Sequence, residues 1–153
     1  MMSKIVRTQA NILYPLILIF GFYIVAHGHL TPGGGFQGGA VIATGVALVA
    51  ISFGYGKIKK WVKKTNLTAA EAVGLLSFII AAFTGIGTSF FCNWLANSGL
   101  IFGDSVPYGP NPGYLNTAGL LPIMNLAVGI EVLGGLGVVV MYMLSAAKAS
   151  EVK

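Results

Sequence analysis

Four long apolar runs, separated by shorter polar segments, dominate the pattern of this chain. Each run is close to the roughly 17 to 25 mainly apolar residues that a helix needs to cross a bilayer. Strand-length alternation is absent, and only helices or closed barrels satisfy every backbone group in hydrocarbon. The pattern predicts an all-α integral membrane protein with a single membrane domain over residues 1–153 and spans at about 11–27, 36–55, 69–91 and 120–144.

Composition and charge support this class. The chain is 56% hydrophobic and 8% charged, whereas soluble domains carry about 25% charged residues. The net charge of +5 would fit nucleic-acid binding, but most of the basic residues lie in one short segment between two apolar runs, at Lys57, Lys59, Lys60, Lys63 and Lys64. We therefore expect a lipid bilayer, and no nucleic acid, around this chain.

The same basic residues predict orientation. With four spans, the basic residues of the N-terminus, the lysine segment and the tail all fall on one side of the membrane. The connections at 27–37 and 93–120 contain no Lys or Arg and fall on the other side. Because Lys and Arg are enriched on the cytoplasmic side, both termini are expected there, in a multi-pass protein of the cell membrane. No small-x-small cleavage site follows the first run, so we expect it to be retained.

The stretch HGHLTPGGGFQGG between the first two runs is unusually rich in glycine. Its Thr-Pro-Gly sequence suits a turn, and the following glycines permit backbone geometries closed to other residues. Irregular backbone near a membrane must be covered by protein or line a polar cavity. We therefore expect it to be a docking loop, made by Pro32, Gly33, Gly34, Gly35 and Phe36.

Two other uses of this stretch are disfavoured. A phosphate cradle lacks both the GxxxxGK[ST] pattern and a nearby lysine. A metal held by His27 and His29 would have only half of a tetrahedral ligand set. We expect neither a metal nor a cofactor.

Acidic residues are rare, so each one needs an explanation. Glu71 follows Thr68 at the spacing of a capping box, which predicts a helix cap at the start of the third span. Asp104 lies in a loop rich in Gly, Pro and Asn, where a solvated acid is ordinary. Glu151 belongs to the tail. Glu131 lies well inside the fourth span, where an ionised carboxylate costs several kcal/mol unless it is paired or hydrated.

The neighbours of Glu131 leave two roles open. The residues three and four positions away are mostly small, which favours contact with protein over contact with lipid: Ala127, Val128, Gly134 and Gly135. The carboxylate either belongs to a proton or Na⁺ pathway or makes an interhelical hydrogen bond or ion pair that fixes assembly. A cationic partner would come from His27, His29 or another subunit.

Small residues recur every four positions on two spans, at Gly39, Ala43 and Ala47 and at Ala81, Gly85 and Ser89. Such rows allow close helix contact in lipid, either within the chain or between subunits. An enzyme is disfavoured, because no nucleophile and base pair, cofactor fingerprint or metal set is visible. An ion-conducting subunit and a purely structural subunit both fit.

The motifs HGHLTPGGGFQGG and GLLPIMNLAVGIEVLGGLG resemble the two motif regions of the MnhB-type (MrpB-type) subunit of the multisubunit Na⁺/H⁺ antiporters. Similar subunits occur in the antiporter-like modules of membrane-bound hydrogenases and of sulfur-reducing respiratory complexes. The resemblance implies a small subunit that packs beside larger antiporter subunits, in a complex that exchanges Na⁺ and H⁺. It does not decide which of these assemblies contains this chain.

Overall fold

The computed structural model describes residues 2–106, 111 and 113–150. Over these residues it is helical, and four of its five helices have the length and hydropathy to cross a membrane. The predicted all-α class with four spans is therefore confirmed. The helices are α1 (Lys4–Ala26), α2 (Gly35–Phe53), α3 (Tyr55–Trp61), α4 (Lys64–Phe83) and α5 (Leu121–Ser150).

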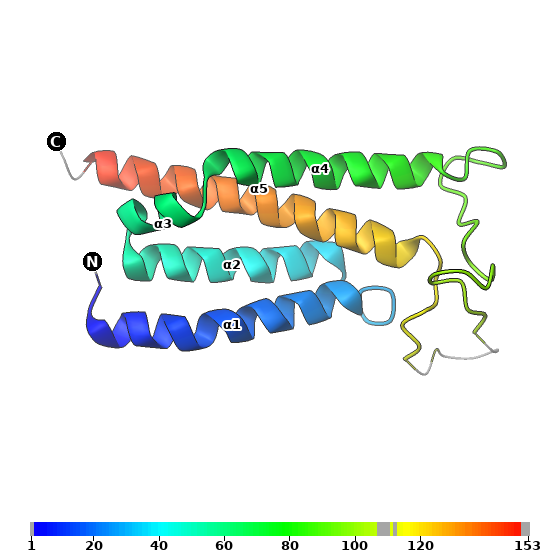
Figure 1. Cartoon of the computed structure of the whole chain (residues 1–153), viewed down its shortest axis with the longest axis horizontal. Coiled ribbons are helices and arrows are strands. Elements are labelled where there is room, and N and C mark those ends of the chain that lie inside the picture. The colour runs from blue at the N-terminus through cyan, green and yellow to red at the C-terminus, as the bar shows by residue number, and fades with distance from the viewer. Residues whose placement is uncertain (1, 107–110, 112, 151–153) are drawn as a thin grey trace.

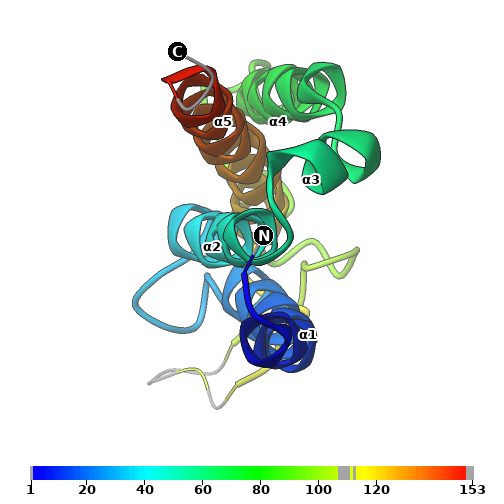
Figure 2. The same cartoon turned by 90° about the vertical axis from the view of Figure 1, so that its left-hand side faces the viewer.

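The four long helices lie side by side in the order α1, α2, α5, α4 (Figures 1 and 2). Helix α5 packs against both α2 and α4, whereas α1 packs mainly against α2. Buried residues make up 50% of the span of α2 but only 17% of that of α1 and 22% of those of α4 and α5. The fold is therefore a layer of helices, and it leaves large apolar surfaces without a neighbour among the described residues.

Glycines set the closest approaches within the layer. A methyl group added at Gly38 of α2 would lie 2.8 Å from the Gly21 carbonyl oxygen of α1, and one at Gly39 would lie 2.7 Å from the Gly129 carbonyl oxygen of α5. Consecutive glycines thus let α2 approach both of its neighbours closely. The predicted role of Gly39 and Ala43 in close packing holds within the chain, since both are buried.

Both described ends of the chain and the short helix α3 lie at one end of the layer, and the two long connections lie at the other (Figure 1). We call these the lysine end and the loop end. The arrangement agrees with basic residues on one side of a membrane. Which side faces the cytoplasm stays a prediction.

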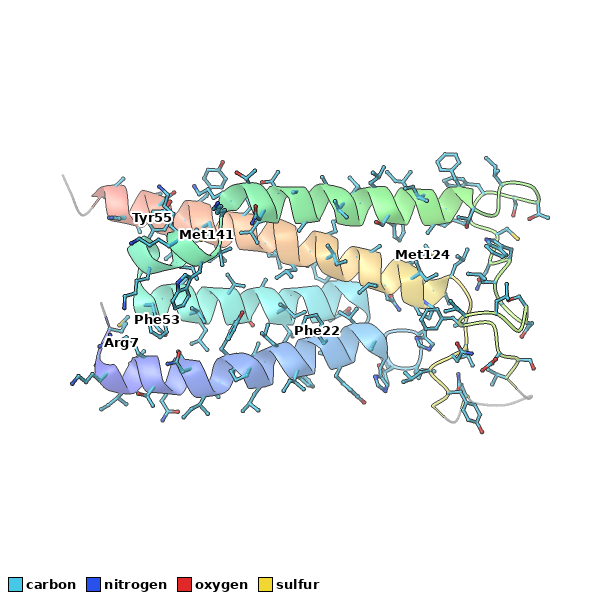
Figure 3. The ribbon with its side chains drawn as sticks, viewed as in Figure 1. Arg7, Phe22, Phe53, Tyr55, Met124 and Met141 are labelled. Atoms are coloured by element: carbon cyan, nitrogen blue, oxygen red, sulfur yellow. The ribbon has the colours of Figure 1, made fainter. Side chains whose placement is uncertain are left out.

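The core at the lysine end consists of Val49, Ala50, Ile58, Leu67 and Met141. Met141 of α5 is fully buried, and the partly buried rings of Phe53 and Tyr55 pack against this cluster (Figure 3). Through Ile58, helix α3 folds back and closes the end of the layer. The lysines of α3 point outward from this core, because all three are exposed.

The boundaries of three spans differ clearly from the prediction, and α5 runs to Ser150, six residues beyond the predicted end of its span. Helix α1 begins at Lys4, a few residues before the apolar run, because the Ser3 hydroxyl accepts a hydrogen bond from the Val6 amide at 3.4 Å. Helix α4 ends at Phe83, eight residues before the predicted end of that span. Turns follow, where the Thr84 and Thr88 hydroxyls bond to backbone carbonyls.

The end of α4 also corrects the predicted row of small residues on that span. Only Ala81 lies in the helix, whereas Gly85 and Ser89 lie in the turns that follow.

The predicted helix cap at Thr68 and Glu71 is wrong. Helix α4 begins at Lys64, with Lys63 at the capping position, so Thr68 and Glu71 are interior helix residues. The helix starts earlier because Leu67 is buried in the core at the lysine end, which fixes the preceding turn in helical form. Glu71 therefore needs another explanation.

Candidate functional site

The glycine-rich loop joins α1 to α2 at the loop end. The His27 carbonyl ends α1 by accepting hydrogen bonds from the Leu30 and Thr31 amides at 2.9 and 3.1 Å. Gly33 has a φ of 110°, a conformation that favours glycine. The Gly34 amide then donates to Oε1 of Gln37 at 2.9 Å and starts α2. Gly33 thus adopts a backbone geometry closed to other residues, as expected, and the second helix starts at Gly35, one residue before the predicted start.

The loop packs on α5 of the same chain. A methyl group added at either Gly28 or Gly34 would lie 2.7 Å from the side chain of Asn125. A methyl group added at Gly35 would collide with the Asn125 carbonyl. Three glycines thus let the loop backbone close over one residue of α5. The partner of the loop backbone is therefore within this chain, whereas Pro32 and Phe36 are exposed on its outer side.

The two histidines lie at this loop and face different surroundings. The His27 ring stacks on Tyr23, with 4.1 Å between centroids, and its Nδ1 lies 3.2 Å from the Tyr23 carbonyl oxygen. Both ring nitrogens of His29 are shielded from solvent and lie beside the backbone groups of Leu115 and Tyr114. Burial lowers the pKa of His29 from its usual 6.5, and the backbone groups of Leu115 and Tyr114 oppose part of that shift.

Glu131 lies on α5 where this helix crosses α4. A methyl group added at Gly74 of α4 would lie 2.5 Å from the Glu131 amide nitrogen and 2.7 Å from the Ala127 carbonyl oxygen. The small residues around Glu131 therefore contact protein, as expected: Ala127 meets α4, whereas Val128 meets Gly35 of α2.

Glu71 occupies the matching position on α4. A methyl group added at Gly134 of α5 would lie 2.6 Å from both the Glu71 amide nitrogen and the Leu67 carbonyl oxygen. The backbone of Glu131 thus packs against Gly74, which follows Glu71 by three residues. In the same way, the backbone of Glu71 packs against Gly134, which follows Glu131 by three residues. Sequence reasoning missed this pairing, and the signal that could have revealed it is the repeated Glu-x-x-Gly of EAVG and EVLG.

These reciprocal contacts place both glutamates on one side of the layer. Two antiparallel helices with matching contacts are related locally by a two-fold axis perpendicular to the layer. Such a rotation exchanges the helices and leaves each side of the layer in place, so equivalent side chains emerge on the same side. We call this surface, with Glu71, Glu131 and the intervening Gly135, the glutamate face.

The carboxylates of the glutamate face have no partner among the described residues: no hydrogen bond or ion pair involves either of them. Both residues are half-buried, and their oxygens stay accessible at the surface of the chain. The histidines do not complete this site, because His29 lies under residues 114–115 at the loop end. Described residues also provide no cluster of three His, Cys, Asp or Glu for a metal.

The long connection between α4 and α5 is held by side-chain amides. The Asn93 side chain donates to the Ala118 carbonyl at 2.9 Å and accepts from the Leu120 amide at 2.8 Å, which fixes the start of α5. Asp104 is exposed and accepts from Nδ2 of Asn116 at 2.8 Å. This acid is part of the loop framework.

The opposite side of α5 borders α1. An apolar cleft of about 380 Å³ lies at the loop end, and a small extension continues it toward the middle of the layer. Phe22, Val25 and Leu126 line both parts, and Phe22 lies in the C-terminal part of α1, toward the loop end (Figure 3). The described residues that line this cleft are apolar and offer no side chain for acid–base chemistry.

The fold and these surfaces define a multi-pass membrane protein with paired acids at one helix crossing. Residues 5–138 match the family described as a domain related to the MnhB subunit of the Na⁺/H⁺ antiporter. The chain belongs to this family, as its resemblance to the MnhB-type subunit implied.

Individual relatives agree with this assignment. An uncharacterised protein of Methanocaldococcus jannaschii is 36% identical over 137 residues, which are 88% of this chain and 49% of that protein. The B component of the Na⁺/H⁺ antiporter of Bacillus subtilis is 30% identical over 57% of this chain and 58% of its own length. The B component of the Alkalihalophilus pseudofirmus antiporter is 37% identical over 54% of this chain and 55% of its own. The chain thus spans about half the length of the curated relatives it matches.

A solved structure shows the same fold. One chain of the membrane-bound sulfane sulfur reductase, an archaeal respiratory membrane complex, superposes with a TM-score of 0.72 at 31% identity. The match covers 93% of this chain and 58% of that one.

Proposed function

We propose that this chain is a small membrane subunit of a multisubunit cation/proton antiporter or of an antiporter-like module in a respiratory complex. The observation that carries the proposal is the match of residues 5–138 to the MnhB-related family. The layered fold supports it, because a row of helices with exposed apolar sides suits packing beside larger membrane subunits. No catalytic step is assigned to the chain itself.

The respiratory module is the favoured host. The likeness to the sulfane sulfur reductase chain covers 93% of this chain at 31% identity. The antiporter components of Bacillus subtilis and Alkalihalophilus pseudofirmus match only 57% and 54% of it. A stand-alone Na⁺/H⁺ antiporter is the second candidate, supported by the names of those relatives.

Glu131 is the proposed contribution of this chain to Na⁺ and H⁺ movement. Its carboxylate lies on a membrane-spanning helix, has no partner within the described residues and stays accessible. An acid in this position is costly to keep ionised, so its presence fits a place in an ion path. His27 and His29 would act separately from it, at the loop end. The competing role is a purely structural one, in which Glu131 only holds a neighbouring helix.

The proposal is tested by extracting the complex from its native membrane with a mild detergent and identifying the co-purifying subunits by mass spectrometry. Iron–sulfur or nickel–iron subunits together with antiporter subunits are the expected result and would establish a redox-driven host. Antiporter subunits alone would establish the stand-alone antiporter. A chain that purifies without antiporter-type subunits under conditions that preserve other membrane complexes would refute both.

A further inference from the structure

The glutamate face is left open by the other described residues of this chain. Leu133 follows Glu131 by two residues, so it projects from the opposite side of α5, and there it borders the extension of the apolar cleft together with Phe22 and Val25 of α1. The border between α5 and α1 therefore lies on the other side of α5. The side that carries Glu71 and Glu131 has no covering helix among the described residues.

No cation of the described chain neutralises this face. Lys64 is the basic residue of α4, and it is engaged elsewhere: its Nζ lies 3.4 Å from the Ser145 hydroxyl and 3.7 Å from the centre of the Tyr142 ring. The histidines lie at the loop end. Two carboxylates at one crossing of membrane helices are costly while they have neither a counter-charge nor water.

We propose that the glutamate face seats a transmembrane helix of another subunit, and that this helix carries a Lys or Arg side chain at the depth of Gly135. The inference rests on the proposed function in one respect, that the chain works inside a larger membrane complex. Charge complementarity identifies the occupant, because a cationic side chain facing the two acids offsets the cost of holding them in hydrocarbon.

The position of Gly135 fixes where that side chain approaches. A methyl group added at Gly135 would meet only the Glu71 carboxylate, whose Oε1 would lie 3.4 Å away. Glycine at position 135 therefore leaves a gap in the surface of α5. This gap lies directly beside Glu71 and one helical turn from Glu131. Small residues of this kind allow a neighbouring helix to come close in lipid.

The two acids spread along the crossing. Side chains on a helix slant toward its N-terminus. Because α4 and α5 are antiparallel, the Glu71 side chain slants toward the lysine end and the Glu131 side chain toward the loop end. Glu71 accordingly reaches Gly135, which lies about 6 Å along α5 from Glu131 at 1.5 Å per residue. A helix lying along the crossing covers both acids, and one long cationic side chain can reach either.

The test uses the purified complex with a photo-reactive benzoylphenylalanine in place of Thr68. Thr68 is exposed and precedes Glu71 by one turn on the same side of α4. The matched control places the same group at Leu76, which is 57% exposed on the side of α4 away from α5. Cross-linked peptides are identified by mass spectrometry, in the wild-type background and in Glu71→Gln/Glu131→Gln, which preserves side-chain size.

The expected product at Thr68 is a peptide from a membrane span of another subunit that contains Lys or Arg. Its yield, relative to the Leu76 product, should fall about tenfold or more in the double variant, since a cation left unpaired in the membrane weakens docking strongly. A product formed with lipid alone, a span without a basic residue, or an unchanged yield in the double variant would overturn the proposal.

The outcome also separates this inference from the proposed function. Antiporter-type subunits that co-purify while Thr68 attaches only to lipid would contradict the docking surface and leave the proposed function standing. A basic span that belongs to a complex without antiporter subunits would support the docking surface and contradict the proposed function.

Discussion

Gly74 and Gly134 are the residues that bring the two glutamates to one crossing. A methyl group at Gly74 would lie 2.5 Å from the Glu131 amide nitrogen, and one at Gly134 would lie 2.6 Å from that of Glu71, closer than real side chains approach backbone. The helices would have to separate to admit even an alanine. Glycine at these positions is therefore a packing requirement that also places the acids.

We expect Gly134→Ala to destabilise the α4–α5 contact by about 1 to 3 kcal/mol, the usual cost of overpacking. The measurement is the thermal unfolding temperature of the purified protein in detergent. Gly56→Ala is the matched control, because a methyl group there meets nothing within 4 Å. Equal melting temperatures for both variants would contradict the close approach at Gly134.

Glu131→Gln separates ion transport from packing. Glutamine keeps the size of the side chain and part of its hydrogen bonding but removes its charge and its titration. If Glu131 carries ions, transport in vesicles should fall while the complex still assembles. Asp104→Asn removes an exposed acid from the loop end and should leave transport unchanged. A Glu131→Gln complex that exchanges ions at the wild-type rate from about pH 6 to about pH 9 would assign the residue to packing alone.

His29 predicts a pH dependence at the loop end. Its pKa is lowered by burial, so the folded loop binds fewer protons than the unfolded one, and folding stability falls as pH drops below the ordinary pKa of 6.5. As pH falls from about 7.5 to about 5.5, hydrogen exchange at residues 113–117 should therefore slow less than the intrinsic rate predicts, which leaves an excess of exchange at low pH. The excess should vanish in His29→Gln. An excess that persists without the histidine would assign the effect to another group.

Sequence reasoning found one acid of the crossing and misassigned the other. Depth alone marked Glu131, because its neighbours on the chain are apolar for several turns. Glu71 stands three residues after Thr68, and this local spacing fits a capping box as well as it fits the interior of a helix. The choice depends on where α4 begins, which is decided by burial of Leu67 against α5, a tertiary contact that no local pattern records.

The glycine-rich loop uses different residues for its contact with α5 and for its exposed outer side. Its backbone at Gly28, Gly34 and Gly35 closes on Asn125 of α5, which fixes the link between α1 and α2. Its outer side presents Phe36, 60% exposed at the start of α2. The sequence predicted a loop that docks through its glycines and Phe36 together, but it could not show that the glycines have their partner within the chain.

This division predicts different results for two variants. Gly34→Val should lower both the stability of the isolated chain and complex assembly, because the new side chain collides with Asn125. Phe36→Ala should leave the stability of the isolated chain nearly unchanged and weaken assembly or transport, because its exposed ring has little to lose within the chain.

Melting of the isolated chain and native gel electrophoresis of the complex measure the two effects. Phe20→Ala on α1, where the ring is 57% exposed, is the control for removing an exposed aromatic side chain. A Phe36→Ala complex that assembles and transports normally would contradict docking of a partner protein at the outer side of this loop.

At the scale of the whole molecule, the layer of helices explains why the chain is suited to an assembly. Helices α1 and α4 form its two edges, and the acids of α4 and α5 open on the side of α5 opposite its border with α1. The number and class of spans followed from hydropathy, because the bilayer fixes both length and composition. Their spatial order did not, since contacts between α2 and α5 depend on glycines far apart in the sequence.

Orientation is the last property that the charge pattern predicts. Both described ends of the chain and the lysine-rich α3 share one end of the layer, and Ser105 lies in the connection at the other (Figure 1). Single cysteines at Ser105 and at Lys60, each in a Cys92→Ser background, place these ends on opposite sides of the membrane. Since Lys and Arg are enriched on the cytoplasmic side, a membrane-impermeant maleimide applied to intact cells should label position 105 and spare position 60 until the membrane is opened. Both positions are exposed, so failure to react cannot be attributed to burial. Labelling of position 60 alone in intact cells would mean that the chain is inserted with its termini outside, and that charges on neighbouring subunits outweigh its own.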